Sequence, residues 1–487
     1  MKRILAFALA CLFVVLSALA ELPEPEDMPT DMILGEARGV NRASVTLFYK
    51  SEDGAGLVPI RRTLEIPAGE TAVERAMEEL LHPGAGAEII SVAPGDTQVI
   101  GVESVSGIVT VNLSIDAAGL QSDQELLVLY TAICNTLMSI EGVRAVDVLI
   151  GSRQESIYSL PTGAMTARES DVTVLWAQYQ SEEERFLEAG ENPASLDRYA
   201  VLYFPSTNGQ WILPELRGVR FRNEDYASQL LDELIAGAYS GDAYSSFLSG
   251  GVSVLASEPQ LYASAAGERV LEIFLTGALR DYMILQGVSE WQMAAAITAT
   301  MCTFIPELDA VIIYVDGQPI TELNVRGNIR QYPGGLLRRD AFAAYIGGVA
   351  PVYFSDGAGG LTKVVRAMSA RRSRSAYSLL LQLISGPTSV DVGAYAVMPA
   401  GVSADDVLGV AIADDVATVN FSANFYRLCQ TLDSAQERAL VFAVVNTLCE
   451  LPDVRAVAML IEGERVETLA NDIYSKSELL PNAGMVR

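Results

Sequence analysis

The alternation of apolar and polar residues follows one pattern that is repeated three times along the chain. Each repeat opens with two alternating apolar stretches around a glycine-containing turn, which is typical of a β-hairpin. A segment with apolar residues at three-to-four spacing follows, then two more alternating stretches, a second helical segment and a closing strand. The pattern therefore predicts three copies of a β-β-α-β-β-α-β module, each the size of an ordinary domain.

Short signals place the helices within each copy. Glycine or proline residues end the first helix, and the second begins at a serine followed three residues later by Glu or Gln, the spacing of a capping box. The first helices are predicted at 72–81, 227–235 and 376–384, and the capping boxes at Ser122 with Glu125, Ser289 with Gln292 and Ser434 with Glu437.

Because helices and strands interleave, each module is expected to be a mixed sheet with two helices packed on one face, an α+β class. Alternating apolar residues at 172–176 predict an extra edge strand in the first linker. The predicted layout is an export signal at 1–20, an acidic Pro-rich tether at 21–43, module 1 at 44–165, a linker at 166–198, a divergent module 2 at 199–335, a linker at 336–348 and module 3 at 349–480.

The first twenty residues have the form of an export signal. Lys2 and Arg3 precede an uncharged stretch at 4–20, which ends in a small-x-small cleavage motif before Glu21. This stretch has the minimum length for a membrane span, so retention as an anchor is an alternative to cleavage, and lipid attachment at Cys11 is another. We therefore predict export, with membrane contact through an uncleaved signal or a lipid anchor.

The charge and the scarcity of histidine exclude several function classes. Acidic side chains outnumber basic ones by 61 to 33, and such a surface repels phosphate backbones, so no nucleic-acid partner is predicted. His82 is the sole histidine, which excludes zinc sites with two histidines, and its position beside Pro83 indicates a helix end. The chain has no Gly-x-x-x-x-Gly-Lys phosphate loop. We predict no catalytic residue, cofactor or metal site.

Three groups of residues have a functional interpretation beside a structural one. The pairs Asp405-Asp406 and Asp414-Asp415 suggest paired carboxylates, but they lack calcium-loop spacing and are expected in a solvated loop and a hairpin turn. The run 371–374 holds three arginines and would suit an acidic partner, such as another module, or else is a solvated segment. The aromatic residues that would suit a glycan groove, or alternatively the core, are Trp176, Trp211, Tyr203 and Tyr353.

Four cysteines follow the signal. An even count in an exported chain suggests disulfides, but three of these cysteines lie on the apolar faces of predicted helices. They also do not occupy equivalent positions in the repeats, so we expect free, buried thiols. The four are Cys134, Cys302, Cys429 and Cys449.

The motifs within the repeats resemble those of a known family. Copy three contains Leu-Ile-Ser-Gly-Pro at 383–387, Thr-Val-Asn-Phe-Ser at 418–422 and Asn-Thr-Leu at 446–448. Copy one keeps related forms at 110–114 and 135–137, whereas copy two lacks the Asn-Thr-Leu triplet. This set resembles the GerMN module of the GerM proteins of spore-forming bacteria. The resemblance implies a sporulation or spore-germination protein in the extracytoplasmic envelope of a Gram-positive-type bacterium, where related modules form ring-like assemblies.

We interpret the chain as a non-catalytic, secreted scaffold or interaction protein of the cell envelope, which acts through self-association or through protein partners there. The alternative is a protein that binds cell-wall glycan through an exposed aromatic groove. A glycoside hydrolase, which needs two carboxylates at one cleft, is disfavoured because the carboxylates are spread over three similar modules.

Overall fold

The computed structural model describes residues 41–487, apart from 55, 68–69, 84–88, 121, 167–170, 188–193, 242, 246–247, 249–253, 471–472 and 474. The predicted signal at 1–20 and residues 21–40 of the predicted tether lie outside the described residues. The first strand begins at Asn41, three residues before the predicted start of module 1, because the hairpin pairing extends from Lys50 back to Asn41, which lies opposite Ile66.

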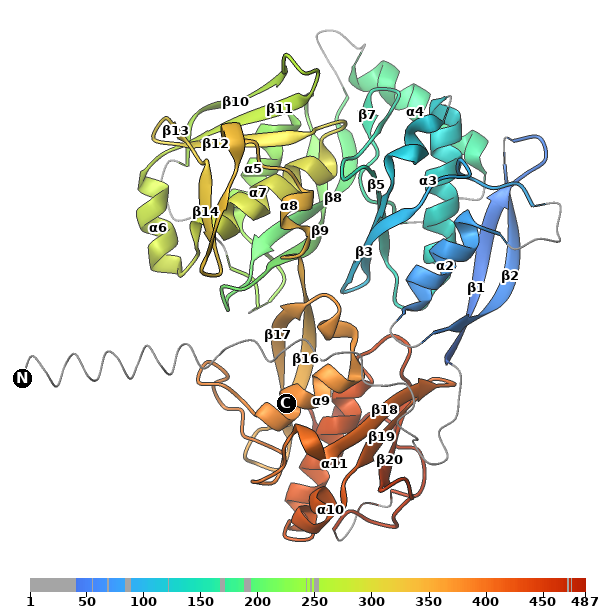
Figure 1. Cartoon of the computed structure of the whole chain (residues 1–487), viewed down its shortest axis with the longest axis vertical. Helices are drawn as coiled ribbons and strands as arrows, with labels where there is room; N and C mark the ends of the chain where they lie inside the picture. Colours follow the sequence, from blue (N-terminus) through green and yellow to red (C-terminus); the bar gives the residue numbers. More distant parts are fainter. Residues whose placement is uncertain are drawn as a thin grey trace, which may run out of the picture.

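The predicted order of elements is present in all three modules, which Figure 1 shows from blue to red along the chain. Module 1 contains β1 (Asn41–Lys50), β2 (Leu57–Ile66), α2 (Ala72–Leu81), β3 (Val99–Val105), β4 (Ile108–Leu113), α3 (Asp123–Leu137) and β5 (Ala145–Ile150). Module 2 contains β8 (Leu196–Pro205), β9 (Ile212–Phe221), α5 (Tyr226–Ala236), β10 (Leu255–Ala263), β11 (Arg269–Leu275), α7 (Glu290–Phe304) and β12 (Ala310–Val315). Module 3 contains β16 (Gly347–Ser355), β17 (Leu361–Ser369), α9 (Ala376–Ser385), β18 (Val407–Ala413), β19 (Val416–Phe421), α11 (Ser434–Leu448) and β20 (Ala456–Ile461).

The α+β class is confirmed, and the strands of each module divide into two sheets. The first two strands form a hairpin of their own. The other three form a mixed sheet, in which the third and fourth strands are antiparallel and the fourth and fifth are parallel. A parallel pair needs a crossover connection, and the second helix supplies it. In module 2 this sheet has a fourth strand, β13 (Gln318–Pro319).

One threonine in the second helix joins the two sheets of each module. Its hydroxyl accepts a hydrogen bond from a backbone N–H of the first strand, at 2.9 to 3.1 Å. This threonine belongs to the Asn-Thr-Leu motif in copies one and three, and copy two keeps it although its neighbours differ. A buried N–H that would otherwise lack an acceptor explains why the threonine is retained. The three pairs are Thr136 with Phe48, Thr300 with Tyr203 and Thr447 with Tyr353.

The edge strand predicted at 172–176 is wrong, since this segment starts the helix α4 (Val172–Phe186). The Asp171 side chain caps the helix by accepting the N–H of Thr173. The buried residues Val172, Tyr179 and Phe186 recur every seven positions and so lie on one helix face. Five alternating residues are too short a window to separate a strand from a helix.

The remaining elements lie between those of the modules or follow them. They are β6 (Ser156–Ile157), β7 (Leu160–Pro161), α6 (Ala278–Gln286), β14 (Glu322–Val325), β15 (Asn328–Gln331), α8 (Asp340–Ala343) and α10 (Ala423–Cys429), with short 3-10 helices η1 (Ile115–Gly119), η2 (Pro333–Gly335), η3 (Arg372–Arg374), η4 (Ala404–Asp406) and η5 (Ala483–Met485).

The predicted starts of the second helices are confirmed in modules 1 and 2. The Ser122 hydroxyl accepts the N–H of Glu125, and Ser289 forms the expected capping box with Gln292. Both contacts satisfy backbone donors that have no partner within the helix.

In module 3 the predicted cap is displaced by one residue. Asp433, not Ser434, caps α11, and Gln436 completes the capping box. A carboxylate is an effective acceptor at the positive end of a helix, which favours Asp433 where both residues are present. Glu437 is instead fully buried and accepts the N–H of Ala470 at 2.8 Å.

Substitution of the two adjacent residues should show which one is the cap. The Asp433 carboxylate accepts two backbone N–H groups, at 2.9 and 2.8 Å, so Asp433→Ala is expected to lower the free energy of unfolding by about 1 kcal/mol. The matched control Ser434→Ala is expected to change it by less than about 0.5 kcal/mol. Urea denaturation of both variants measures the difference, and equal losses would contradict the assignment.

Two hydrophobic cores hold the three modules. Modules 1 and 2 share one continuous core, which includes residues of α3, β8 and α7. Module 3 has a separate core built around α9, α11 and its own sheet. Modules 1 and 2 therefore form one packed unit, to which module 3 is attached.

Candidate functional site

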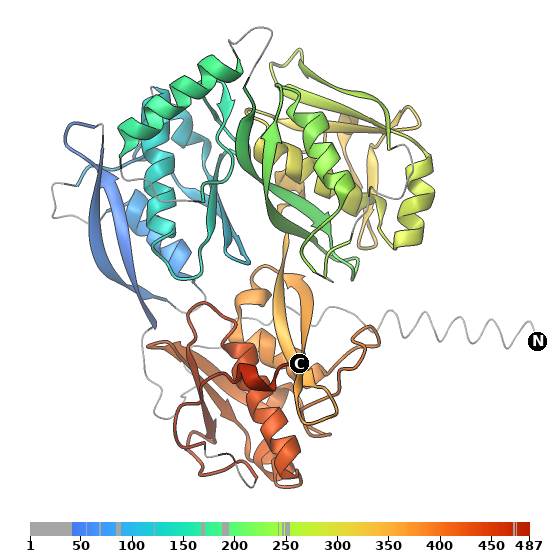
Figure 2. The same cartoon turned by 180° about the vertical axis from the view of Figure 1, so that it is seen from behind.

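The junction of modules 1 and 2 gathers buried polar side chains from both modules. The sheet of module 1 faces the hairpin of module 2, and Figure 2 shows the two modules side by side. The backbone N–H of Ala164, near the end of module 1, donates to the carbonyl of Tyr199 on β8 at 2.8 Å. We treat this junction as the candidate functional site because it decides how the repeated modules act together.

Arg339 is the central residue of the junction, and its side chain is 1% exposed. Its Nη2 atom lies 2.7 Å from Oε2 of Glu103 on β3 and 2.9 Å from the hydroxyl oxygen of Tyr203 on β8. Its Nε atom donates to the Thr303 hydroxyl at the end of α7, at 2.8 Å. The Tyr203 hydroxyl also donates to Glu103, at 3.2 Å. One guanidinium thus joins a strand of module 1 to a strand and a helix of module 2.

The sequence did not identify Arg339 as a functional residue. Arg339 lies in the predicted linker 336–348, and Glu103 lies 236 residues earlier in the chain. No local motif connects two residues at that separation. A single arginine among ordinary surface charges has no periodic signal that marks it as buried.

A second buried acid lies close to this arginine. Asp147 on β5 is 2% exposed, and its Oδ1 accepts a hydrogen bond from Nε2 of Gln154 at 3.2 Å. The side-chain oxygen of Gln154 accepts the N–H of Gly163, next to the contact with β8. Burial raises the pKa of Asp147 to about 7, although the positive charge of Arg339 acts in the opposite direction. Asp147 therefore changes charge near neutral pH.

Asp147 should make the stability of the junction depend on pH. Its pKa is raised in the folded state, so the folded chain keeps a proton that the unfolded chain loses between about pH 4 and 7. The stabilising contribution is complete below the pKa of the unfolded state and is lost as pH rises through about 7. Asp147→Asn is expected to match the wild type closely at pH 4 and to exceed its free energy of unfolding at pH 8 by about 4 kcal/mol.

Denaturation at the two pH values tests this difference. Asp232→Asn is the matched control, because Asp232 is an exposed acid within α5. It should leave the pH dependence of the wild type unchanged. A parallel pH dependence of the wild type and the Asp147→Asn variant would contradict the assigned role of Asp147.

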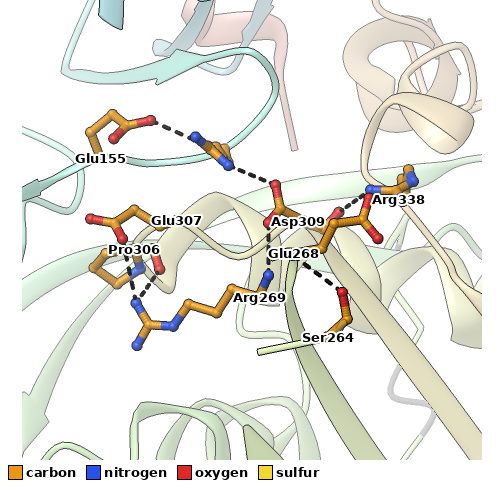
Figure 3. A network of polar contacts seen from close by, with 9 residues as sticks. Glu155, Ser264, Glu268, Arg269, Pro306, Glu307, Asp309 and Arg338 are labelled. Carbon is orange, nitrogen blue, oxygen red and sulfur yellow. Dashed lines mark hydrogen bonds and ion pairs between the residues drawn. The ribbon is translucent and has the colours of Figure 1, made fainter. Parts of the chain in front are cut away.

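An ion-pair network extends the junction toward the surface, and Figure 3 shows it from close by. The carboxylate of Asp309 in module 2 accepts a hydrogen bond from Nη1 of Arg153 in module 1, at 2.6 Å. Its other oxygen accepts the backbone N–H of Arg269 at 2.8 Å. Arg153 also pairs with Glu155 at 3.3 Å. The network fixes the segment after β5 of module 1 onto the start of β11 and β12 of module 2.

A cavity of about 190 Å³ lies at the same junction, between α3, α4 and β8. Its lining includes Cys134, Tyr179 and Arg198. The Arg198 guanidinium pairs with Glu182 at 2.6 Å and lies 5.0 Å from the centroid of the Tyr179 ring. Arg198 therefore holds α4 against the hairpin of module 2.

An arginine that no motif of the sequence marked recurs in every module. It is the sixth residue of the second strand in each copy: Arg62, Arg217 and Arg366. In modules 2 and 3 it donates to the carbonyl of the glycine that ends the first helix, at 2.9 Å. In module 1 it pairs instead with Glu79 on α2. Aligning the three copies places this arginine at the same position in each. A residue kept at one position of every repeat indicates a structural role.

The asparagine of the Thr-Val-Asn motif is likewise structural. The Asn112 side chain accepts the N–H of Ser152 at 2.9 Å, and that of Asn420 accepts the N–H of Gly463 at 2.8 Å. Each bond ties the end of the fourth strand to the turn after the fifth. The motif therefore specifies the fold of the module.

The prediction of a solvated loop is wrong for Asp406, which is 4% exposed. Its carboxylate accepts hydrogen bonds from the Ser422 hydroxyl at 2.5 Å, the Ser403 N–H at 2.9 Å and the Asn424 side chain at 3.1 Å. Burial acts to raise the pKa of Asp406, but these bonds outweigh it and lower the pKa. Ser422 and Asn424 lie further along the chain, so the residues next to Asp406 in the sequence give no sign of these hydrogen bonds. Asp405, in contrast, is exposed.

Two other structural predictions are confirmed. Asp414 and Asp415 are exposed and have φ angles of 50° and 62°, as in a tight hairpin turn. His82 ends α2, and its backbone N–H donates to the carbonyl of Glu78 at 2.9 Å.

The arginine run at 371–374 lies beside module 1. Arg371 is exposed, whereas Arg374 is partly buried. Burial lowers the pKa of Arg374, while the Glu74 carboxylate on α2 acts to raise it. One charge of the run therefore interacts with an acidic residue of another module.

The four aromatic candidates for a glycan groove do not lie together. Tyr203 and Tyr353 are buried in the two cores. Trp176 on α4 packs against Tyr158 with tilted rings, whose centroids are 4.6 Å apart. The Cζ atom of Arg326 lies over the Trp211 ring, 4.0 Å from the ring centroid. These residues do not form a common surface.

The four cysteines are free, as the sequence predicted. Cys134, Cys302 and Cys429 are buried, and Cys449 is partly exposed. Burial raises the pKa of the Cys449 thiol to about 11, so this thiol is protonated at neutral pH. Within the described residues, no group of three or more acidic, histidine or cysteine side chains could hold a metal ion.

In the part of the chain that the structure describes, no helix is both long enough and apolar enough to span a membrane.

Comparison with known proteins gives one family and several related structures. A family model described as "Germane: Sporulation and spore germination" matches residues 46–155, 201–321 and 351–467. A search of curated proteins finds no match.

Two of the similar solved structures come from the sporulation protein GerM of Bacillus subtilis. Its tandem GerMN domains are 17% identical to this chain, with a TM-score of 0.24, and the match covers 59% of this chain and 98% of that one. Its first GerMN domain is 20% identical, with a TM-score of 0.19, and the match covers 22% of this chain and 83% of that one. The three stretches that the family model matches include most of the residues, one stretch in each module. The chain therefore belongs to the Germane family of sporulation and spore germination, and it contains three copies of the family module.

Proposed function

We propose that this protein is a non-catalytic scaffold or interaction protein, secreted into the extracytoplasmic cell envelope of a Gram-positive-type bacterium. It acts through contacts between modules or with envelope proteins, in sporulation or spore germination. Family membership supports the biological setting. The apolar segment at 4–20 supports export.

The junction of modules 1 and 2 carries the proposal. Its buried ionisable groups are used to join two modules, and Arg339 is bonded to three side chains from both of them. A protein that binds partners over a large surface benefits from modules held in one orientation, because little conformational freedom is lost on binding. Two flexibly linked modules would lack this advantage.

The net charge of −28 also bears on the partner. It disfavours anionic polymers and favours cationic or neutral partner surfaces. Binding of cell-wall glycan remains the alternative function, but the separation of the aromatic candidates gives it less support.

Light scattering of residues 21–487 over a concentration series tests the proposal. Defined oligomers at raised concentration are the expected result. In parallel, sedimentation with purified cell walls tests the alternative, and the protein is expected to stay in the supernatant. A protein that stays monomeric at every concentration and sediments with the walls would overturn the scaffold proposal in favour of glycan binding.

A further inference from the structure

Modules 1 and 3 contact each other through equivalent strands, the first strand of each module against the third strand of the other. The first strand of module 1, β1, contacts the third strand of module 3, β18. The first strand of module 3, β16, contacts the third strand of module 1, β3. Such reciprocity resembles that of an isologous contact, but here the two surfaces belong to different modules, so the surface of module 3 is complementary to that of module 1.

The loops after the second helices also meet. A Cβ atom placed on Gly142, between α3 and β5, would lie 2.9 Å from the Cβ atom of Pro452, between α11 and β20. The two residues occupy corresponding loops of their modules. In Figures 1 and 2 module 3 lies against the lower side of the other two modules, so this contact closes the three-module arrangement.

This contact is less complete than the junction of modules 1 and 2. No common core crosses it, since the core of module 3 is separate. Among the described residues, the buried Nη1 atom of Arg374 has no hydrogen-bond acceptor, although the Glu74 carboxylate of module 1 is near enough to raise the pKa of Arg374. A buried donor without an acceptor weakens the packed state relative to the open state. Separation of modules 1 and 3 therefore costs less than separation of modules 1 and 2.

Module 3 is attached to the rest of the chain beside its first strand. Ile346 pairs with Ile212 of β9, and Gly347 and Gly348 begin β16 directly afterwards. The Asn208 side chain donates to the carbonyl of Ala367 near the same place. These contacts tie one end of module 3 to module 2, while its face toward module 1 is held by the reciprocal strand contacts, the contact of Gly142 with Pro452 and the interaction of Arg374 with Glu74.

We propose that this face of module 3 docks not only on module 1 of the same chain but also on module 1 of a second copy. The partner is thus another copy of this protein, bound by exchange of module 3. The closed chain is favoured at low concentration, because the tether gives module 3 a high effective concentration near its own module 1. At high concentration exchange produces a heterologous assembly that can extend or close into a ring. The proposal rests on the scaffold function proposed above and names the surface through which copies associate.

Disulfide trapping between two cysteine variants of the chain of residues 21–487 tests the proposal. One variant carries Gly142→Cys and the other Pro452→Cys, since the two positions are in direct contact and the loops need to separate by only about 1 Å to reach the Cβ spacing of a disulfide. The two variants are mixed, oxidised and analysed by mass spectrometry of the linked peptides. A disulfide between one chain of each kind is expected, and its fraction should rise about tenfold for a tenfold rise in concentration while it is the minor species.

A chain with both substitutions is the matched control. It is expected to close the disulfide within itself and to lose association, because the contact is then locked in one copy. Closure in the double variant without any linked heterodimer in the mixture would overturn the proposal. Failure of the double variant to close, or equal amounts of disulfide-linked homodimer from each single variant alone, would also overturn it. If light scattering still detects oligomers in those cases, the scaffold function stands and another surface is responsible.

Discussion

Arg339→Ala is expected to lower the free energy of unfolding of the unit formed by modules 1 and 2 by about 3 to 5 kcal/mol. The substitution removes a guanidinium that is 1% exposed, and the Glu103 carboxylate and the Tyr203 hydroxyl both lose the donor that they share. Glu103 is 17% exposed, so its carboxylate, without its counter-charge, retains much of the cost of desolvation. The nearby Asp147 also loses the charge that opposes the rise of its pKa, so the loss of stability should grow at high pH.

Arg222→Ala is the control for this substitution. Arg222 belongs to the same module and is exposed, so its replacement should change the free energy of unfolding by less than about 0.5 kcal/mol. Denaturant titration monitored by circular dichroism and by tryptophan fluorescence measures both variants. A loss of similar size in both, or none in either, would show that the junction is not held by Arg339.

The second expected result concerns the unfolding of fragments that contain one or two of the modules. Residues 41–345 and residues 346–487 are each expected to unfold in one cooperative transition, whereas residues 194–345 alone are expected to show none. Modules 1 and 2 share one core, so isolation of module 2 exposes apolar side chains and leaves Arg339 without Glu103. Module 3 keeps its own core when it is isolated.

Calorimetry and the amide dispersion of NMR spectra test the fragments. The fragment of modules 1 and 2 is the matched control for module 2, since it contains the same residues with their neighbour. A cooperative transition of isolated module 2 at the temperature found in the pair would show that the modules are independent. The shared core would then contribute little to stability.

The asparagines and threonines of the family motifs share one physical role in this protein. The motif residues Asn112, Thr136, Asn420 and Thr447 accept backbone N–H groups that the strands and turns leave without partners. These bonds are local to one module, so they recur wherever the module recurs. Arg339 and Asp147 belong to none of these motifs, and they lie where modules 1 and 2 meet.

The sequence by itself determined the number of modules, the order of their elements, the class of the fold and the free state of the cysteines. These features depend on periodicity, caps and turn residues, which act over a few positions. Where local signals competed, the prediction was wrong: Val172 to Trp176 alternate, yet the cap at Asp171 and the apolar face continued by Tyr179 favour a helix. Asp433 similarly replaced Ser434 as the cap of α11.

Only the tertiary structure decided which modules share a core and which contacts join them. The bond between Arg339 and Glu103 spans 236 residues, and that between Arg153 and Asp309 spans 156. No periodic pattern encodes a pair at such separation, because its stability depends on the burial that packing creates around both charges. The modules are alike in sequence pattern, but the structure fuses two of them and leaves the third with a core of its own.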